Sequence, residues 1–355
     1  MTNSPVVVRF GSLGDLAQLA PLLVRLHRAT GARIDLLTAN AAAPALLGRL
    51  AATGEIRIAH GRRAPYLLSR DQRESADWLR RRPGAPVCLV ETVPGARPPL
   101  LGLLRHGRVA AAMIFDAALL ERAPLEHTLG FLERVGAEFL RRIAPGAPVP
   151  AAPELPRLLP DAAETAELVA WRERTGLARR PLVVFHVTSR RKNRGRWPSE
   201  RWAQLARAIL EREPEAAILV SGTAAERPEI ARQVAACRDR RVIDAAGELP
   251  IGRLLALLAA ADSSVMLDSG PAHLAAAAAC PLVVLHGMAD PRRVAPRGTG
   301  PIEVIAGLPE CSWPPDPFLW QRLNRLDDLT VDAVLAAWER VRSDAALGAG
   351  SLSAS

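Results

Sequence analysis

A strand–turn–helix rhythm, found on both sides of a proline-rich segment, constrains this chain most strongly. In the first half, a β-branched run at residues 6–9 leads into a glycine turn, leucines at helical spacing and a second apolar run at 34–38. The second half repeats this plan, with apolar runs at 182–185, 217–220, 264–267 and 282–285. Helical segments lie between these runs, at 202–210, at 251–261 and after the turn at 268–271. Strands that alternate with helices predict a parallel sheet in each half.

Residues 145–160 separate the two halves and contain six prolines. Proline fixes φ and lacks an N–H donor, so this stretch is read as a stiff extended linker. Because open parallel sheets bind ligands at the carboxyl ends of their strands, two such sheets predict a cleft with a ligand site. We expect an N-terminal domain, a C-terminal domain, a C-terminal helix and a disordered tail, at 1–150, 161–326, 327–345 and 346–355.

Cysteine spacing and charge limit the possible function classes. The four cysteines form no C-x-x-C pair, which argues against a zinc module or a disulfide framework and favours a reducing compartment. Since neither a signal peptide nor a membrane-spanning run is apparent, we expect a cytoplasmic protein. Residues 1–160 carry 21 Arg against 13 Asp and Glu, so +8 of the net +9 lies there. This bias predicts a phosphorylated substrate or an anionic membrane surface, or merely a solvated arginine-rich surface; no nucleic-acid recognition motif accompanies it.

The turn after the first run reads R-F-G-S-L-G-D at residues 9–15. Its two glycines let the backbone turn sharply and approach a ligand closely. Asp15 then lies at a helix start, at the carboxyl end of a strand, where its carboxylate could accept a proton. The alternative is that Asp15 only caps the helix, as Asp often does. The spacing does not match the dinucleotide fingerprint G-x-G-x-x-G.

A second turn, D-S-G-P-A-H at residues 268–273, opens the alanine-rich helix. Ser269 is a good N-cap, and Gly270 allows close approach to the free amides of the helix start, which predicts a diphosphate site. His273 lies in the first helical turn, where the helix dipole favours its neutral form. The alternative is a capped helix with a packed histidine.

Two further strand ends carry polar residues. The loop at 186–198 offers two hydroxyls, Thr188 and Ser189, followed by five cations that include Lys192 and Arg196. Such a loop suits a nucleotide diphosphate, or it is a plain solvated basic loop. In G-T-A-A-E at 222–226, the terminal carboxylate could accept hydrogen bonds from ribose hydroxyls, or it is an ordinary helix-start glutamate.

Together these motifs resemble glycosyltransferase family 9, the ADP-heptose:lipopolysaccharide heptosyltransferases. The resemblance spans roughly residues 5–340, is strongest over 182–300, and has D-S-G-x-x-H as its most specific motif. It is carried by R-x-x-S-L-G-D (Arg9, Ser12, Leu13, Gly14, Asp15), R-W-P (196–198), G-x-x-x-E (222–226), D-S-G-P-A-H-L-A-A-A (268–277), P-L-V-V-L-H-G (281–287) and A-D-P (289–291).

The resemblance implies a GT-B fold, in which two Rossmann-like domains face a cleft. It implies inverting transfer of a heptose from ADP-heptose to an anionic lipid-linked sugar of the lipopolysaccharide core, at the inner face of the cytoplasmic membrane. Asp15 matches the general base on the acceptor side, beside Arg9, Ser12 and Gly14. The positions that match the donor site are Thr188, Ser189, Gly222, Glu226, Leu249, Asp268, Ser269, Gly270 and His273.

One departure from the family pattern concerns the phosphate-binding lysine, two residues before the W-P pair, where this chain has Gly195. Lys192, Arg194 or Arg196 could supply the missing charge. No D-x-D triplet occurs, so we expect neither an obligatory metal nor a cofactor, and the basic loop and helix dipole would neutralise the diphosphate. Alternatives are a protein or small-molecule acceptor, a sugar-nucleotide epimerase of the same architecture, or a binding protein that has lost activity.

Overall fold

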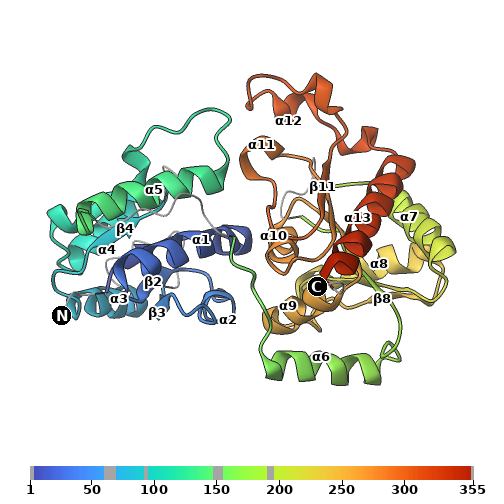
Figure 1. Ribbon diagram of the computed structural model, residues 1–355, viewed down its shortest axis with the longest axis horizontal. Coiled ribbons are helices and arrows are strands. Elements are labelled where there is room, and N and C mark those ends of the chain that lie inside the picture. Colours follow the sequence, from blue (N-terminus) through green and yellow to red (C-terminus); the bar gives the residue numbers. More distant parts are fainter. Residues whose placement is uncertain (1–3, 60–68, 92–94, 147–154, 190–195, 353–355) are drawn as a thin grey trace. The chain divides into compact units, whose positions relative to one another are not determined.

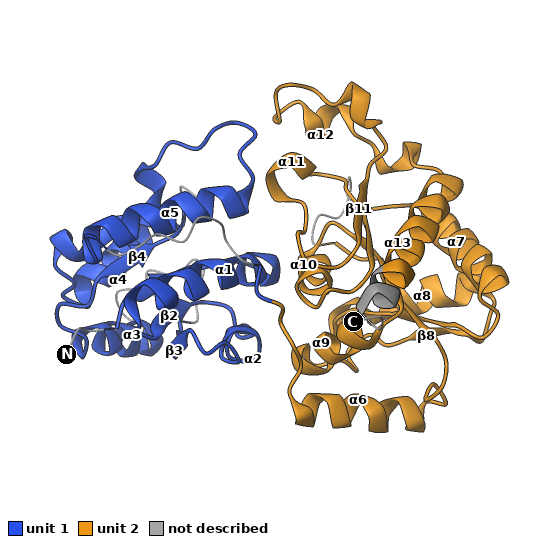
Figure 2. Cartoon of the chain, viewed as in Figure 1, with its two compact units in different colours: residues 1–156 blue, residues 157–355 orange. Residues whose placement is uncertain are grey.

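Short buried runs of valine, isoleucine and leucine form the strands of two separate parallel sheets. The structure is a computed structural model, and it describes residues 4–59, 69–91, 95–146, 155–189 and 196–352. The chain divides into two compact units, Met1–Pro156 and Arg157–Ser355, drawn in blue and orange in Figure 2. The boundary between them falls inside the proline-rich segment.

The first unit has a five-stranded parallel sheet in the order β3-β2-β1-β4-β5. Figure 1 labels β2, β3 and β4 of this sheet. Its strands are β1 (Val6–Val8), β2 (Ile34–Thr38), β3 (Thr53–Ile58), β4 (Val87–Leu89) and β5 (Ile114–Asp116). Its helices are α1 (Leu13–Thr30), α2 (Ala43–Leu47), α3 (Arg70–Arg80), α4 (Arg97–His106) and α5 (Thr128–Ile143), with 3-10 turns at Ala111–Met113 and Ala117–Leu119.

Successive side chains along each strand point to opposite faces of this sheet, and both faces are buried. Val6 and Val8 belong to a core cluster with Trp78 of α3 and Leu103 of α4, so these helices cover one face. Val7, which points the other way, is equally buried, and α1 packs along α5 on that side. The helix α1 ends where predicted, because Gly31 adopts the left-handed conformation, with φ of 69°, that terminates a helix.

The second unit has a six-stranded parallel sheet in the order β11-β10-β9-β6-β7-β8. Its strands are β6 (Leu182–His186), β7 (Ala217–Val220), β8 (Val242–Asp244), β9 (Ser263–Leu267), β10 (Leu282–Leu285) and β11 (Ile302–Ile305). Its helices are α6 (Ala162–Arg174), α7 (Ser199–Arg212), α8 (Arg227–Cys237), α9 (Ile251–Ala260), α10 (Gly270–Ala277), α11 (Pro291–Val294), α12 (Trp320–Leu323) and α13 (Val331–Leu352). Short 3-10 turns lie at Ala224–Glu226 (η4), Glu310–Ser312 and Leu326–Asp328.

Large aromatic side chains fill one side of this sheet. Trp202 of α7 and Trp338 of α13 join Phe185, Ile218 and their neighbours in one core cluster. On the other side α9 packs against α6 and α10. The central strands are buried along their whole length, as expected for a sheet that is covered on both faces.

The expected tail at 346–355 is wrong in part, because α13 continues to Leu352. Alanine and leucine dominate its last turns, and both are strong helix formers, which outweighs the two glycines there. The helix also begins at Val331, later than the expected residue 327, since Leu326–Asp328 forms a separate 3-10 turn. None of the helices in the described part of the chain combines the length and apolar character that a membrane crossing requires.

Candidate functional site

Asp15 lies in the first turn of α1, just beyond the carboxyl end of β1. Ser12, not Asp15, is the N-cap residue of this helix. Asp15 is its capping-box partner: Oδ2 accepts hydrogen bonds from the Ser12 amide at 2.6 Å and from Ser12 Oγ at 2.8 Å. The expectation of a simple Asp cap is therefore replaced by a carboxylate at the third helical position that holds the start of its own helix.

Arg9 also binds the Asp15 carboxylate. Its Nη2 donates to Asp15 Oδ1 at 2.5 Å, and its Nη1 donates to the Val90 carbonyl at 2.7 Å, which ties the end of β1 to the end of β4. Glu91, only 1 % exposed, lies 3.9 Å from Arg9 Nη1. Sequence reasoning did not single out Glu91, although an acidic residue directly after the apolar run at 87–90 was a usable signal.

The Asp15 side chain is 31 % exposed, so it is partly desolvated yet open to a ligand. Burial raises its pKa, but the charge of Arg9 and the hydrogen bonds from Ser12 outweigh that effect and hold the pKa below its usual range. Asp15 is therefore ionised at neutral pH. Gly11 makes room for it, because a Cβ at that position would lie 2.3 Å from Asp15 Cβ, and Gly14 is buried in the same turn.

In the second unit, the N-terminus of α10 forms a candidate anion site. Ser269 is the extended N-cap residue, and its Oγ is buried with no hydrogen-bond partner among the described residues. Gly270 opens the helix, and His273 lies half-buried in the first turn. A buried hydroxyl left unpaired beside free helix amides fits a phosphate oxygen, since such groups normally find a partner.

Asp268 precedes this helix and faces a buried histidine. Its Oδ1 lies 3.5 Å from Nε2 of His286, which is fully buried at the end of β10. The other ring nitrogen, Nδ1, contacts the Ala289 carbonyl at 2.9 Å and must donate there, because a carbonyl only accepts. His286 was named only within the P-L-V-V-L-H-G motif, and the structure places its ring beside Asp268.

Glu226 repeats the arrangement of Asp15. Its Oε2 accepts from the Thr223 amide and from Thr223 Oγ1, both at 2.7 Å, so it is the capping-box partner in η4. Burial raises the Glu226 pKa, but hydrogen bonds from Thr223 and Thr188 keep it below the usual value. A Cβ at Gly222 would meet Ile230 Cδ1 at 2.2 Å, so the Ile230 side chain would have to shift.

The remaining residues predicted for the donor site lie on several elements of the second unit. Half-buried Leu249 is brought near η4, because the Gly247 amide donates to the Gly222 carbonyl at 2.8 Å. Arg196 pairs with Glu229 of α8 at 2.9 Å. Thr188 is buried just beyond β6, with Ser189 half-buried beside it, whereas Lys192 lies outside the described residues.

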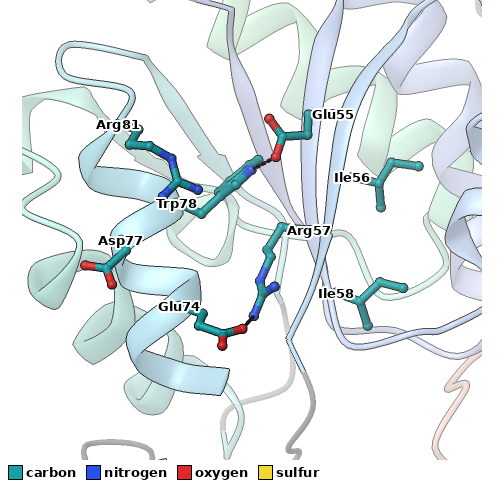
Figure 3. Close-up of a pocket in the computed structure, with 8 residues that line it drawn as sticks. All are labelled: Glu55, Ile56, Arg57, Ile58, Glu74, Asp77, Trp78 and Arg81. Atoms are coloured by element: carbon teal, nitrogen blue, oxygen red, sulfur yellow. Dashed lines mark hydrogen bonds and ion pairs between the residues drawn. The ribbon is translucent and has the colours of Figure 1, made fainter. Parts of the chain in front are cut away.

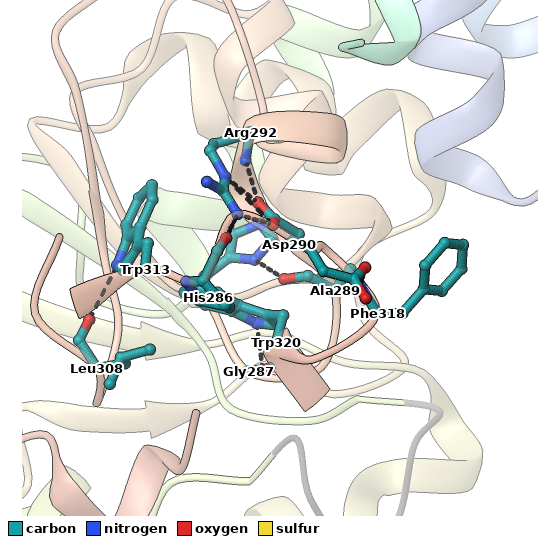
Figure 4. A network of polar contacts seen from close by, with 11 residues as sticks. His286, Gly287, Ala289, Asp290, Arg292, Leu308, Trp313, Phe318 and Trp320 are labelled. Carbon is teal, nitrogen blue, oxygen red and sulfur yellow. Dashed lines mark hydrogen bonds and ion pairs between the residues drawn. The ribbon is translucent and has the colours of Figure 1, made fainter. Parts of the chain in front are cut away.

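The segment after β11, from Leu308 to Asn324, packs against the loop that follows β10 (Figure 4). Asn324 Nδ2 donates to the carbonyls of His286 and Gly287 at 2.9 and 2.7 Å, and its Oδ1 accepts from the Leu308 amide at 3.0 Å. Trp320 Nε1 also donates to Gly287, at 3.0 Å. The segment thus clamps the loop that carries His286.

A cavity of about 550 Å³ in the first unit lies elsewhere, between β3 and α3 (Figure 3). Glu55, Arg57, Glu74 and Trp78 line it, and they already bind one another: Trp78 Nε1 donates to Glu55 at 2.5 Å, and Arg57 pairs with Glu74 at 3.2 Å. None of the predicted site residues lines this cavity. Among the residues with assigned positions, no three His, Cys, Asp or Glu side chains gather as metal ligands would.

Three comparisons place the chain among known proteins. A sequence search of curated proteins finds no match. Among solved structures, a family 9 glycosyl transferase from Veillonella parvula DSM 2008 is 16% identical with a TM-score of 0.77, covering 96% of this chain and 98% of its own. The Escherichia coli ADP-heptose lps heptosyltransferase II is 20% identical with a TM-score of 0.71 and the same coverage. E. coli heptosyltransferase WaaC, solved with ADP, is 18% identical with a TM-score of 0.65, covering 95% and 99%.

These likenesses confirm the predicted α/β fold of the GT-B kind, with two parallel sheets flanked by helices. The model of glycosyltransferase family 9 (heptosyltransferase) matches residues 96–310. That match spans more than half of the sequence and includes the D-S-G-P-A-H turn. The chain therefore belongs to glycosyltransferase family 9 and is a glycosyltransferase of the heptosyltransferase family.

Proposed function

We propose that this enzyme transfers a heptosyl group from ADP-heptose to a hydroxyl of a lipopolysaccharide core sugar, with Asp15 as the general base. The Asp15 carboxylate carries the proposal, because it is ionised and oriented by two neighbours at the carboxyl edge of its sheet. An ionised carboxylate has about four acceptor positions. Ser12 and Arg9 use three of them, which leaves one for the proton of an incoming hydroxyl.

The proposed reaction is a single displacement. Asp15 takes the proton of the acceptor hydroxyl while that oxygen attacks the anomeric carbon of the donor. The bond from the anomeric carbon to the diphosphate oxygen breaks, ADP leaves with the bonding electron pair, and the configuration at that carbon inverts.

On the donor side, we assign the diphosphate to the start of α10, where the Ser269 hydroxyl and the Gly270 amide would meet it. Thr188 and Ser189 extend this site from the end of β6. Glu226 would accept from the ribose hydroxyls, and Leu249 would pack beside the base. The WaaC structures with ADP and with ADP-2-deoxy-2-fluoro heptose support an ADP-sugar donor. We assign Asp268 and His273 to the sugar and phosphate side of that donor. In this proposal the helix dipole of α10 and the cations at 190–196 would neutralise the diphosphate without an obligatory metal. Arg196 would have to leave Glu229 to take part.

We assign an anionic glycolipid at the inner membrane surface as the acceptor, which fits the +8 charge of residues 1–160. The acids that pair with arginines in this range, such as Asp35 and Glu55 with Arg82 and Glu138 with Arg141 and Arg142, are already subtracted in this net value. The full +8 would therefore contribute to attraction by an anionic surface. Binding to vesicles that contain anionic lipid should fall as salt rises from 50 to 500 mM (roughly the range over which screening becomes strong), and salt-independent binding would contradict this assignment.

The first test is Asp15→Asn, compared with Glu164→Gln. Glu164 is a capping-box carboxylate of α6 outside the site, so its variant controls for the loss of a helix cap. The Asn variant should lose about 10²–10⁴ in kcat, while the Kd for ADP should change less than about threefold. Wild-type turnover in the Asn variant would remove Asp15 from the mechanism.

The second test compares ADP, UDP and GDP by calorimetry in the presence of EDTA. Preference for ADP supports the ADP-heptose assignment, whereas preference for UDP or GDP would leave Asp15 in place and exclude that donor. Turnover assays with a heptose-deficient lipopolysaccharide core, a protein and a small-molecule hydroxyl then distinguish the acceptors.

A further inference from the structure

A buried chain of polar side chains lies behind the proposed diphosphate site. His186 is the last residue of β6, and Ser221 follows β7 on the neighbouring strand. His186 Nδ1 lies 3.1 Å from Ser221 Oγ, and His186 Nε2 lies 3.4 Å from Thr188 Oγ1. All three side chains are at most 6 % exposed, so these hydrogen bonds are formed without help from bulk water.

The partners fix the direction of this chain. Ser221 Oγ donates to the Phe185 carbonyl at 3.1 Å, because a carbonyl only accepts. Ser221 Oγ must therefore accept from His186 Nδ1. A neutral imidazole carries one N–H, so Nε2 presents a lone pair to the Thr188 hydroxyl, which can donate to it.

Burial keeps His186 neutral in the free protein. Burial lowers its pKa, and Glu226 is the charged group that acts in the opposite direction. Thr188 also interacts with Glu226, so its hydroxyl lies between the imidazole and that carboxylate. Both neighbours of Thr188 are thus acceptors in the free protein, and they compete for its single proton.

A phosphate oxygen brings a third acceptor to the same hydroxyl. Thr188 can donate to that oxygen once Glu226 accepts from the ribose hydroxyls instead and His186 Nε2 ceases to be an acceptor. An imidazolium does this, because it donates from Nε2 to Thr188 Oγ1 and releases the hydroxyl proton toward the phosphate. The negative charge of the diphosphate favours the same imidazolium.

We propose that binding of the nucleotide diphosphate is coupled to uptake of one proton by His186, relayed through Thr188. The proton comes from bulk solvent and forms the Nε2–H bond; no covalent bond to the nucleotide forms or breaks. This inference rests on the proposed function, because it requires the diphosphate to reach Thr188. The sign follows from linkage: affinity rises as pH falls through the pKa of His186 in the complex and levels off below its pKa in the free protein.

Calorimetric titration of the full-length protein with ADP, in buffers of different ionisation heat near pH 7, measures the protons taken up. We expect wild type to take up about 0.5–1 proton more than His186→Gln. The glutamine amide is a permanent donor to Thr188, so this variant should still bind ADP within about tenfold of wild type. Titration of the ADP terminal phosphate, with a pKa of about 6, cancels in the difference. His106→Gln, at an exposed histidine of the first unit, is the matched control and should behave as wild type.

Thr188→Val tests the relay without altering the buried ring, and it too should abolish the extra uptake. Equal proton uptake in wild type, His186→Gln and Thr188→Val would overturn the proposal. Loss of the extra proton uptake in His273→Gln alone would assign the proton to His273 instead. If UDP or GDP binds in place of ADP, the same titration is run with that nucleotide, so only the donor assignment fails. If none of the three binds, the proposed function and this coupling both fail.

Discussion

Replacing Asn324 with leucine should destabilise the second unit because it leaves two backbone groups without their hydrogen-bond partner. Asn324 is 6 % exposed and joins the loop after β10 to the segment after β11. Leucine has a similar size but no polar atoms. Gly287 would keep the hydrogen bond from Trp320, whereas the His286 carbonyl and the Leu308 amide would lose the bonds from Asn324.

The magnitude follows from the cost of leaving such groups unsatisfied, about 1–3 kcal/mol each when buried. Leu308 is only half-buried, which places its amide at the lower end. We therefore expect a loss of about 2–4 kcal/mol in the free energy of unfolding of this unit, partly offset by burial of the leucine side chain. For a unit of this size, that corresponds to a Tm lowered by roughly 5–15 °C.

Tryptophan fluorescence during urea unfolding is the assay, because six of the seven tryptophans lie in the second unit. Hydrogen exchange of the Leu308 amide should also accelerate. Asn40→Leu is the control: it alters the first unit, where Asn40 Nδ2 makes one longer bond of 3.3 Å to Gly11, and should leave the tryptophan transition in place. A change below about 0.5 kcal/mol in Asn324→Leu, with unchanged exchange at Leu308, would refute the reasoning.

Three further predictions concern single groups. Gly11→Ala should lower kcat at least about tenfold with little change in the Kd for ADP, because its Cβ would displace Asp15; steady-state kinetics and calorimetry check this. Arg9→Gln removes the cation that opposes burial, so the pKa of Asp15 should rise; since Asp15 acts only when ionised, the acid limb of the kcat/KM profile should move to higher pH, and an unmoved limb would contradict this. Burial raises the pKa of the Cys280 thiol to about 12, and the other two buried cysteines shift the same way. An aromatic disulfide reagent at pH 8 should therefore modify one thiol in the native chain, the exposed Cys311, and a count of two or more would be inconsistent with the structure.

Four strands of the second unit, β6, β7, β9 and β10, were predictable because their buried runs are largely apolar, as is typical of a sheet covered on both faces. The strands β8 and β11, which contain Asp244 and Glu303 and are less buried, were not predicted. Residues 57–145 were harder to interpret. The strands at Val87–Leu89 and Ile114–Asp116 have three residues each, too few to show a periodicity, and α3 is mostly polar with a narrow buried stripe.

Within the candidate site, Asp15 and the D-S-G-P-A-H turn could be read from the sequence because each is one contiguous motif. The contacts of Glu91 and His186 could not be predicted, although the position of Glu91 after an apolar run was a usable signal. Glu91 lies near Arg9 and His186 contacts Ser221 only because each sheet brings together distant parts of the sequence. The ion pair of Arg196 could not be predicted either, since Glu229 lies in α8, 33 residues further along the sequence.

Asp15 and Glu226 each close a capping box at the start of their helix, and this shared feature affects how the chain would respond to relaxed selection. Many catalytic side chains are a burden to folding, so a protein that loses its activity soon loses them. Here removal of either carboxylate also removes a helix cap, which typically contributes about 1 kcal/mol. An inactive descendant would therefore be under pressure to keep both acids, and their presence in a related sequence would not by itself be proof that the sequence encodes a working enzyme.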